Sequence, residues 1–369
     1  MEAENQLRYQ VAFNHVRGIG AIRTARLLEY FGSLEAAWQA SPTALRLHGL
    51  PEKIVQSLLS FRDRTDPSEL LAAIQKRGIR ILSRDDPYYP PLLKMIEAPP
   101  PVLYVRGEMP DASAQYVAIV GTRRMTGYGK NVAEELSAYL AGHGVVVVSG
   151  LARGVDGTAH QAALDHKGRT VAVLGCGVDV IYPPEHRSLA EAVVRNGALI
   201  SDYPPGTQPD RVNFPPRNRI ISGMACACIV IEAGEKSGSL ITARFAAEQG
   251  REVFVLPGNF NAPQSQGANR LIRDGARPLC AKEELLEYIR SDQAILPHQL
   301  PKPIQMSFES PQEQAMMALI EAEALHIDEI TRLSGLPAGK VASMLTLLVL
   351  KGFVVEVAPQ QFQKNNALY

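Results

Sequence analysis

The sequence predicts an α/β protein built around a doubly wound, mostly parallel sheet. Two observations lead to this class. Between residues 115 and 290 the chain contains short runs of β-branched residues that are apolar throughout, which indicates strands covered on both faces. Segments with helical periodicity separate these runs, and an alternation of strand and helix is typical of a parallel sheet with helices on both sides.

The elements of this central domain follow one another along the chain. The predicted strands are 117–120, 145–149, 171–174, 199–201, 228–231 and 253–256. The predicted helices between them are 129–141, 158–166, 189–195, 219–225 and 240–249. The arrangement is Rossmann-like, and we expect ligands to bind where the strands end on their carboxyl side.

The rest of the chain predicts flanking regions. Residues 1–66 contain short helices separated by glycine turns, and 67–290 form an extended Rossmann-like domain. Residues 291–310 hold three prolines without periodicity, which indicates a linker. Residues 311–369 predict three helices and a strand, the pattern of a winged helix. Its helix at 338–350 is nearly all apolar, so we expect it to pack against protein rather than to read duplex DNA.

A Gly18-Ile19-Gly20 turn between two predicted helices is typical of a helix-hairpin-helix unit. In such units the glycines let backbone N–H groups approach a phosphate of DNA. The same unit also occurs purely as a packing element. Both interpretations stay open for residues 1–66.

Charge and composition exclude several classes of protein. The 369-residue chain carries 38 basic and 38 acidic side chains, which excludes a uniformly basic surface but not a local basic groove. Its four cysteines are too few for a disulfide scaffold and are not spaced for zinc. No apolar run approaches the roughly 20 residues of a membrane helix, and no secretory signal is visible. We therefore expect a cytoplasmic protein without a membrane contact or a metal.

The segment after the first strand of the central domain predicts an anion site. It reads Gly121-Thr122-Arg123-Arg124 and leads into a helix. A glycine, a hydroxyl and two guanidinium groups at a helix N-terminus suit a phosphate. Two bulky arginines in this position argue against a nicotinamide dinucleotide lying on the turn.

The segment after the second strand offers a second set of candidates, Ser149, Gly150 and Arg153. The glycine permits close approach of the backbone to a ligand, and the arginine adds a cation. Asp156 and His160 follow, and they have two interpretations: general acid–base chemistry, or a helix cap with packing. We favour the structural interpretation, because neither a second carboxylate nor a cluster of metal ligands accompanies the pair.

A loop after the fourth strand predicts contacts to a single nucleic-acid strand. Its candidate residues are Gly206, Arg211, Phe214, Arg217, Asn218 and Arg219. Arginines that contact phosphates beside an aromatic face that stacks on a base are typical of single-strand binding. An alternative is that Phe214 packs in the core beneath the loop, and the sequence leaves both open.

The last candidate segment, Lys236-Ser237-Gly238-Ser239, enters a helix and predicts a phosphate cradle. It is not a Walker A loop, because the lysine precedes the last glycine. The sequence also contains no nucleophile elbow, no HExxH and no acidic pair for two metals. Cations that converge without a base, nucleophile or metal favour a binding site over an active site, so we expect neither a catalytic residue nor a cofactor.

Four segments together carry a resemblance to a known family. GTR at 121–123, SGLARGVD at 149–156, PRNRIISG at 216–223 and KSGSLITA at 236–243 resemble the hallmark motifs of the DNA-processing protein A family (DprA, or Smf). Thr122 stands where that family usually has serine, which keeps the hydroxyl. The resemblance covers essentially the whole chain, including a sterile-alpha-motif-like N-terminal domain and a winged-helix-like C-terminal domain.

The resemblance implies a function and partners. Members of that family bind single-stranded DNA in the cytoplasm during natural transformation, act as homodimers through the Rossmann-like domain, and load RecA recombinase onto strands covered by single-strand-binding protein. It also implies roles for individual residues: Arg123 as a phosphate-binding arginine, Gly206, Arg211 and Phe214 as a strand-contacting loop, and Lys236 as a pocket lysine. We place the dimer seam in the helices of 266–289.

Two alternatives remain. Rossmann-like enzymes that cleave nucleoside monophosphates are one, but they carry P-G-G-x-G-T followed by paired glutamates, and the segment 233–244 lacks those glutamates. The other is a pure adaptor protein without affinity for DNA. Turnover of AMP distinguishes the enzyme from a single-strand binder. Titration with oligo-dT distinguishes the adaptor from it.

Overall fold

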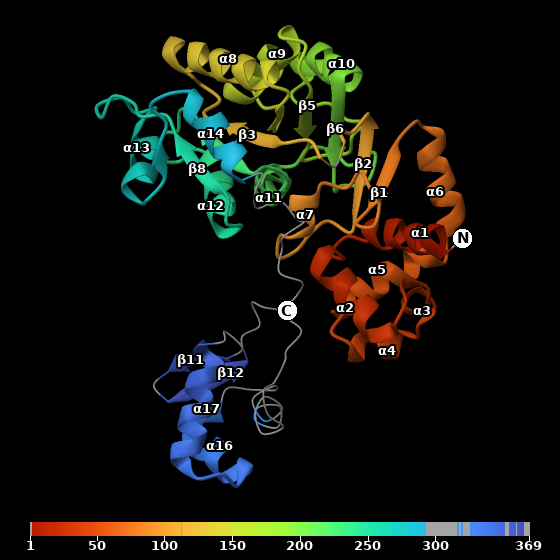
Figure 1. Cartoon of the computed structure of the whole chain (residues 1–369). Coiled ribbons are helices and arrows are strands. Elements are labelled where there is room, and N and C mark those ends of the chain that lie inside the picture. The colour runs from red at the N-terminus through yellow and green to blue at the C-terminus, as the bar shows by residue number, and fades with distance from the viewer. Residues whose placement is uncertain are drawn as a thin grey trace. The chain divides into compact units, whose positions relative to one another are not determined.

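The computed structural model describes residues 2–111, 113–292, 325–350, 354–358 and 360–364, together with 316 and 319. The chain divides into two compact units, Met1–Ala294 and Ile295–Tyr369. The first unit holds the helical N-terminal region and the large sheet, and the second holds the winged-helix elements (Figure 1). No helix among the described residues has the length and apolar character needed to cross a bilayer.

The centre of the first unit is a nine-stranded sheet with the order β1-β2-β6-β5-β4-β3-β7-β8-β9. In chain order its strands are β1 (Arg80–Ser83), β2 (Val102–Gly107), β3 (Tyr116–Val120), β4 (Val146–Ser149), β5 (Thr170–Val173), β6 (Gly197–Ser201), β7 (Ala227–Val230), β8 (Glu252–Val255) and β9 (Arg277–Pro278). All neighbours pair in parallel except β1 with β2 and β2 with β6. The predicted doubly wound, mostly parallel sheet is therefore confirmed, and the segment before it adds an antiparallel edge.

Helices cover both faces of this sheet, as Figure 1 shows. One face packs on α8 (Gly127–Gly142), α9 (Val155–Asp165), α10 (Arg187–Asn196) and α14 (Glu283–Asp292). The other packs on α7 (Pro91–Lys94), α11 (Phe214–Met224), α12 (Ser239–Glu248) and α13 (Gln266–Arg273). Because β3 to β8 are buried on both sides, most of their residues are apolar, which is the pattern the sequence shows.

One helix begins earlier than the sequence predicts. We expected the helix after the fourth crossover to start at residue 219, but α11 begins at Phe214. Pro215 and Pro216 occupy its first turn, where proline is tolerated because the N–H groups there have no partner within the helix. Arg217, Asn218 and Arg219 therefore lie on helix faces and not on an extended loop.

The N-terminal region contains α1 (Glu2–Asn14), α2 (Ala21–Phe31), α3 (Leu34–Gln39), α4 (Pro42–Leu47), α5 (Glu52–Arg62) and α6 (Pro67–Lys76). Gly18 has φ of +95°, and a Cβ there would lie 2.8 Å from Cδ1 of Ile54 on α5. Packing and backbone conformation thus account for this glycine. The region joins the sheet through Asn14, whose side chain accepts from Tyr104 Oη (2.9 Å) and donates to the carbonyl of Asp202 (3.2 Å).

The second unit contains β10 (Leu325–His326), α16 (Ile327–Ser334), α17 (Ala338–Leu350), β11 (Val354–Ala358) and β12 (Gln361–Lys364). Its strands form a sheet of order β10-β12-β11, with antiparallel pairing. The apolar face of α17 is buried in the core of this unit. The linker predicted at 291–310 and the first part of the predicted winged helix, residues 311–324, lie almost wholly outside the described residues.

Candidate nucleic-acid interface

A groove of about 930 Å³ runs along the carboxyl edge of the sheet. The loops that follow β3, β4 and β7 meet there with the first turn of α11, because parallel strands release their loops on the same side. Most of the residues predicted from the sequence line it: Gly121, Thr122, Arg123, Arg124, Arg211, Phe214, Arg217, Asn218, Lys236, Ser237, Gly238 and Ser239. Segments that are up to 118 positions apart in the chain are thus brought together.

The wall of the groove is cationic. Arg123, Arg124, Arg211 and Lys236 are exposed, and among the described residues no carboxylate lies within ion-pair distance of any of them. Asp156 is the only acidic side chain among the described residues that line the groove, and it is buried. The result is a positive surface open to a polyanion in a chain whose net charge is zero.

The loop after β3 is held rigidly by the neighbouring strand β7. The Thr122 N–H donates to the carbonyl of Glu232 (2.7 Å), and the Thr122 hydroxyl accepts from the Arg124 N–H (3.1 Å). The Glu232 carboxylate in turn accepts from the N–H (2.9 Å) and the hydroxyl (2.5 Å) of Thr126, the N-cap of α8. The two arginines therefore project from a backbone that is fixed before any ligand binds.

Phe214 lies between two guanidinium groups. Its ring centre is 5.9 Å from Cζ of Arg123 and 5.8 Å from Cζ of Arg217, within the range of cation–π attraction. A Cβ on Gly175 would lie 2.7 Å from the ring, so the absence of a side chain there makes room for it. The ring is half-buried and also lines the groove. Phe214 thus packs on the loop beneath it and also faces the groove, and stacking of its ring on a base stays a prediction.

Arg217 is an internal residue and not a free phosphate-binding cation. Its side chain is 5% exposed and donates to the carbonyls of Gly150 (3.0 Å) and Val173. Burial lowers the pKa of the guanidinium, and the facing Asp156 carboxylate opposes that shift. Arg217 thereby ties α11 to the ends of β4 and β5 and supports the ring of Phe214 from below the groove.

Asp156 has a different role from the one predicted. Helix α9 begins at Val155 with Gly154 as its N-cap, so Asp156 lies within the first turn. Its carboxylate accepts from the N–H groups of Gly150 (3.2 Å) and Ala152 (3.4 Å). Burial raises the pKa of Asp156, and the Arg217 guanidinium opposes this. Asp156 therefore shapes the loop after β4 and does not cap the helix.

His160 is a structural residue. It is fully buried and its Nδ1 lies 2.7 Å from the hydroxyl of Thr170. Burial lowers its pKa to about 3, so the ring is neutral near pH 7. Ser149 is also buried, and its hydroxyl donates to the carbonyl of Ile119 (2.6 Å). Neither side chain reaches the groove.

Arg219 is turned away from the groove. Its guanidinium pairs with Asp202 (2.8 Å) and donates to the carbonyl of Ala98. The reason is helical geometry, since residues two apart on a helix point in different directions, and Arg217 already faces the groove side. The prediction of Arg219 as a strand-contacting cation assumed an extended loop, and the structure corrects it.

Two further candidates lie outside the main groove. Arg153 is exposed but paired with Glu185, and it lines a separate cavity of about 20 Å³ behind Phe214, as does Gly150. Gly206 adopts φ of +86°, and its N–H donates to Asp179 (2.8 Å). The structure therefore leaves Arg153 and Gly206 as neighbours of the groove and not as part of its lining.

Tyr182 is an aromatic side chain of the groove that the sequence did not reveal as a site residue. Its ring centre is 5.7 Å from that of Phe214, at an interplanar angle of 33°, and it lines both cavities. The only available signal was an aromatic residue in the segment after a central strand, which is a weak pattern by itself.

Comparison with known proteins places the chain in a family. A model described as DNA recombination-mediator protein A matches residues 80–290, and a model described as the DprA winged helix domain matches residues 301–358. Protein Smf of Synechocystis sp. is 35% identical, over 98% of this chain and 100% of its own. The chain belongs to the DNA recombination-mediator protein A family. DNA processing protein DprA of Bacillus subtilis, another member, is 44% identical over 59% of this chain and 74% of its own.

Solved structures of this DprA family resemble the present one. DNA processing protein A from Streptococcus pneumoniae has a TM-score of 0.66 at 32% identity, over 76% of this chain and 97% of its own. DNA processing protein A from Helicobacter pylori, described for its unique single-stranded DNA binding mode, has a TM-score of 0.52 at 31% identity, over 58% of this chain and 96% of its own. The family resemblance of the four sequence motifs is therefore confirmed.

Proposed function

We propose that this DprA family member binds single-stranded DNA in the groove at the carboxyl edge of its sheet. One observation carries the proposal: Arg123, Arg124, Arg211 and Lys236 line one groove together with the ring of Phe214, without acidic partners among the described residues. The single-stranded DNA binding described for the Helicobacter pylori protein supports it. The free cations neutralise phosphates, and the exposed part of the phenyl ring stacks on a base.

The fixed backbone lowers the entropic cost of binding a strand in this groove. The loops after β3 and β7 are held by hydrogen bonds within the fold, so ordering them on binding costs little entropy. Binding through phosphates is insensitive to base identity, and we expect weak sequence preference with strong dependence on salt. Stacking of one base contributes about 1–3 kcal/mol.

The decisive experiment is a titration with fluorescently labelled oligo-dT. The wild type is compared with Arg123→Ala and Phe214→Ala, and with Arg153→Ala as a matched control, because Arg153 is exposed and lies beside the groove but not in its lining. We expect the first two variants to lose affinity and the control to retain it. Unchanged affinity in both groove variants would overturn the proposal.

We propose further that the bound strand is delivered to RecA after displacement of single-strand-binding protein, in the cytoplasm, as the family resemblance implies. A RecA filament assay on DNA coated with single-strand-binding protein tests this step. The wild type should shorten the lag before filaments form, and Arg123→Ala should not. Equal lags with and without the protein would reject the delivery step.

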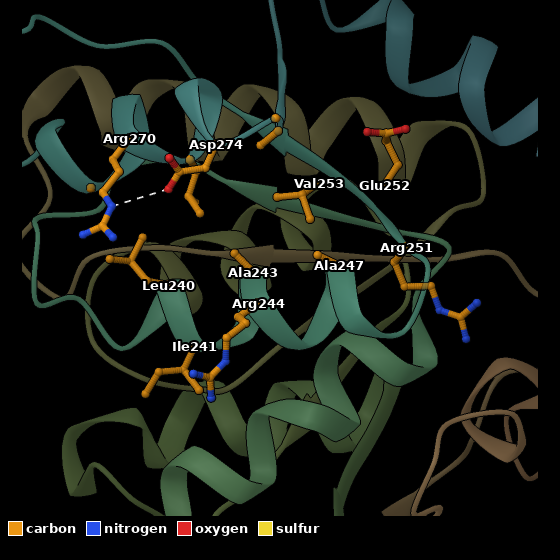
Figure 2. Close-up of a pocket in the computed structure, with 14 residues that line it drawn as sticks. Leu240, Ile241, Ala243, Arg244, Ala247, Arg251, Glu252, Val253, Arg270 and Asp274 are labelled. Atoms are coloured by element: carbon orange, nitrogen blue, oxygen red, sulfur yellow. Dashed lines mark ion pairs between the residues drawn. The ribbon is translucent and has the colours of Figure 1, made fainter. Parts of the chain in front are cut away.

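We also propose that the protein acts as a homodimer through the Rossmann-like domain, with its seam in 266–289. A hollow of about 670 Å³ between α12, α13 and β8 supports this placement. Figure 2 shows Ala243, Ala247 and Val253 along it, with the Arg270–Asp274 ion pair at one end. An apolar floor with a charged rim is typical of an interface. Ala247 lies outside 266–289 but in the lining of this hollow. Ala247→Arg should yield a monomer in gel filtration, whereas an unchanged elution volume would refute the hollow as part of the seam.

The residues in and near the groove favour a binding function over a catalytic one. The segment that enters α12 lacks the paired glutamates of nucleotide-cleaving relatives of the fold. The buried Asp156 carboxylate accepts from two backbone N–H groups and interacts through its charge with Arg217. We therefore propose that the protein is not an enzyme. Incubation with AMP should release no adenine, and measurable turnover would favour the enzyme instead.

For the winged helix we propose a protein-contact role. Leu347 and Val349 on α17 are 46% and 37% exposed, and Lys340 is the one basic residue of that helix. DNA readers place several donors and cations on the helix that enters the groove. Deleting 311–369 should therefore leave affinity for duplex DNA unchanged, and a large loss would reassign this unit to DNA.

A further inference from the structure

The most exposed of the large apolar side chains in the described part of the chain lies outside the groove. Phe260 is 79% exposed, and no aromatic ring or cation of the described residues is within stacking range of it. Exposing a phenyl ring to water is unfavourable, and a turn that holds such a ring in solvent makes it available to a partner. A partner that covers the Phe260 ring must therefore offer it a flat apolar face.

The loop that carries Phe260 is ordered by its own hydrogen bonds. The side chain of Asn269 accepts from the Gly258 N–H (3.1 Å) and donates to the Gly258 carbonyl (2.9 Å). Asn259 accepts from the N–H of Asn261 through its side chain (3.0 Å), which closes a turn around Phe260. The phenyl ring is thus presented at the apex of a built turn.

This loop is joined to the groove. It follows β8, the strand beside β7, so it leaves the sheet at the same carboxyl edge as the loop that carries Lys236. The Ala268 N–H donates to the carbonyl of Ala233 (3.1 Å). A Cβ on Gly267 would lie 2.5 Å from the carbonyl oxygen of Gly234, so the two segments are in direct backbone contact.

The two aromatic residues lie at separate points along one edge of the sheet. Phe214 rests on Gly175, just after β5, and Phe260 follows β8. The sheet order places four strand spacings between them, about 19 Å at about 4.8 Å each. Lys236, after β7, lies between these points. At about 3.4 Å per nucleotide in a helical strand, about six nucleotides cover this distance, and an extended strand needs fewer.

The composition of the loop favours a nucleic-acid base as the partner of the Phe260 ring. Residues 257–266 contain no acidic side chain and four uncharged amides, so a polyanion approaches without repulsion. We propose that Phe260 is a second base-stacking platform, on which a single strand that leaves the groove past Lys236 lays a further base. The inference rests on the proposed single-strand binding and extends it by naming where the strand leaves the groove.

A fluorescence experiment tests this directly. The chain contains one tryptophan, Trp38, which is 6% exposed in the N-terminal helical core. In Phe260→Trp, saturating dT12 should quench the new tryptophan strongly, while the same oligonucleotide should hardly change the emission of the wild type. Saturation is established independently by anisotropy of labelled dT12. Full occupancy without quenching would overturn the proposal.

Affinity measurements separate stacking from simple apolar contact. Phe260→Ala should weaken dT12 binding by about fivefold, the low end for loss of one stacking aromatic. Phe260→Leu should be as weak as the alanine variant, since it is apolar without a π-face, and Phe260→Tyr should bind like the wild type. Full affinity in Phe260→Ala, or in Phe260→Leu, would refute a stacking role.

Two controls distinguish a failure of this inference from a failure of the proposed function. If wild-type protein fails to bind dT12, or Arg123→Ala binds like the wild type, the groove itself is at fault. If Phe260→Ala changes the elution volume in gel filtration with unchanged affinity per protomer, Phe260 contacts a second copy of the chain, and the stacking proposal is wrong. Loss of dT12 affinity with unchanged elution supports it.

Discussion

The buried pair of Arg217 and Asp156 allows a prediction that tests how the groove is built. Arg217→Met keeps most of the side-chain volume but removes the guanidinium, which is 5% exposed and bonds two backbone carbonyls. Removing the guanidinium leaves the two carbonyls it bonds and the nearby Asp156 charge buried without compensation, which costs about 3–5 kcal/mol. At about 2–4 °C per kcal/mol, the melting temperature should fall by about 10 °C.

The pH dependence of this loss has a definite sign. Burial already raises the pKa of Asp156 in the folded protein, and Arg217 restrains that rise. Without Arg217 the folded-state pKa lies further above the unfolded value, so the folded state binds the proton more tightly. Stability of the variant relative to the wild type should therefore improve as pH falls through the window between the raised folded-state pKa and the unfolded-state pKa.

Urea unfolding followed by circular dichroism at pH 7 and pH 5 measures both effects. Arg217→Met with Asp156→Asn should recover a large part of the lost free energy, since the double variant buries no unpaired charge. The reasoning is refuted if Arg217→Met unfolds within about 1 kcal/mol of the wild type at pH 7. A loss that is equal at both pH values, or one that Asp156→Asn does not change, would also refute the assigned coupling.

Three other predictions concern binding of oligo-dT. Arg123→Ala should lower the slope of log affinity against log salt by about 0.7, the value for one phosphate on a single strand, and an unchanged slope would contradict a phosphate contact. Gly175→Ala should weaken binding several-fold, because the new methyl group would lie 2.7 Å from the Phe214 ring and displace it, and titration at low salt checks this. Arg219→Gln should leave affinity nearly unchanged but lower the melting temperature, because Arg219 pairs with the partly buried Asp202. A large loss of affinity at full stability would return Arg219 to the groove.

The amino-acid sequence alone predicted the sheet and most of the groove. Apolar, β-branched runs identify β3 to β8, because strands covered on both faces tolerate little else. Glycine and cationic segments at the strand ends then identify the groove, since parallel strands release their loops at one edge. Arg123, Arg124 and Lys236 follow from this rule without coordinates, and the structure brings them into one lining.

Only the tertiary structure decided which charges are free. Arg211, Arg217 and Arg219 are equivalent in sequence terms, yet the first is exposed, the second is buried against backbone carbonyls and the third pairs with Asp202. The difference arises because α11 begins at Phe214, which sends neighbouring side chains to different faces, and because their partners lie on distant strands. The free energy of a charge depends on its burial and its partners in space, and neither is encoded in the residues beside it along the chain.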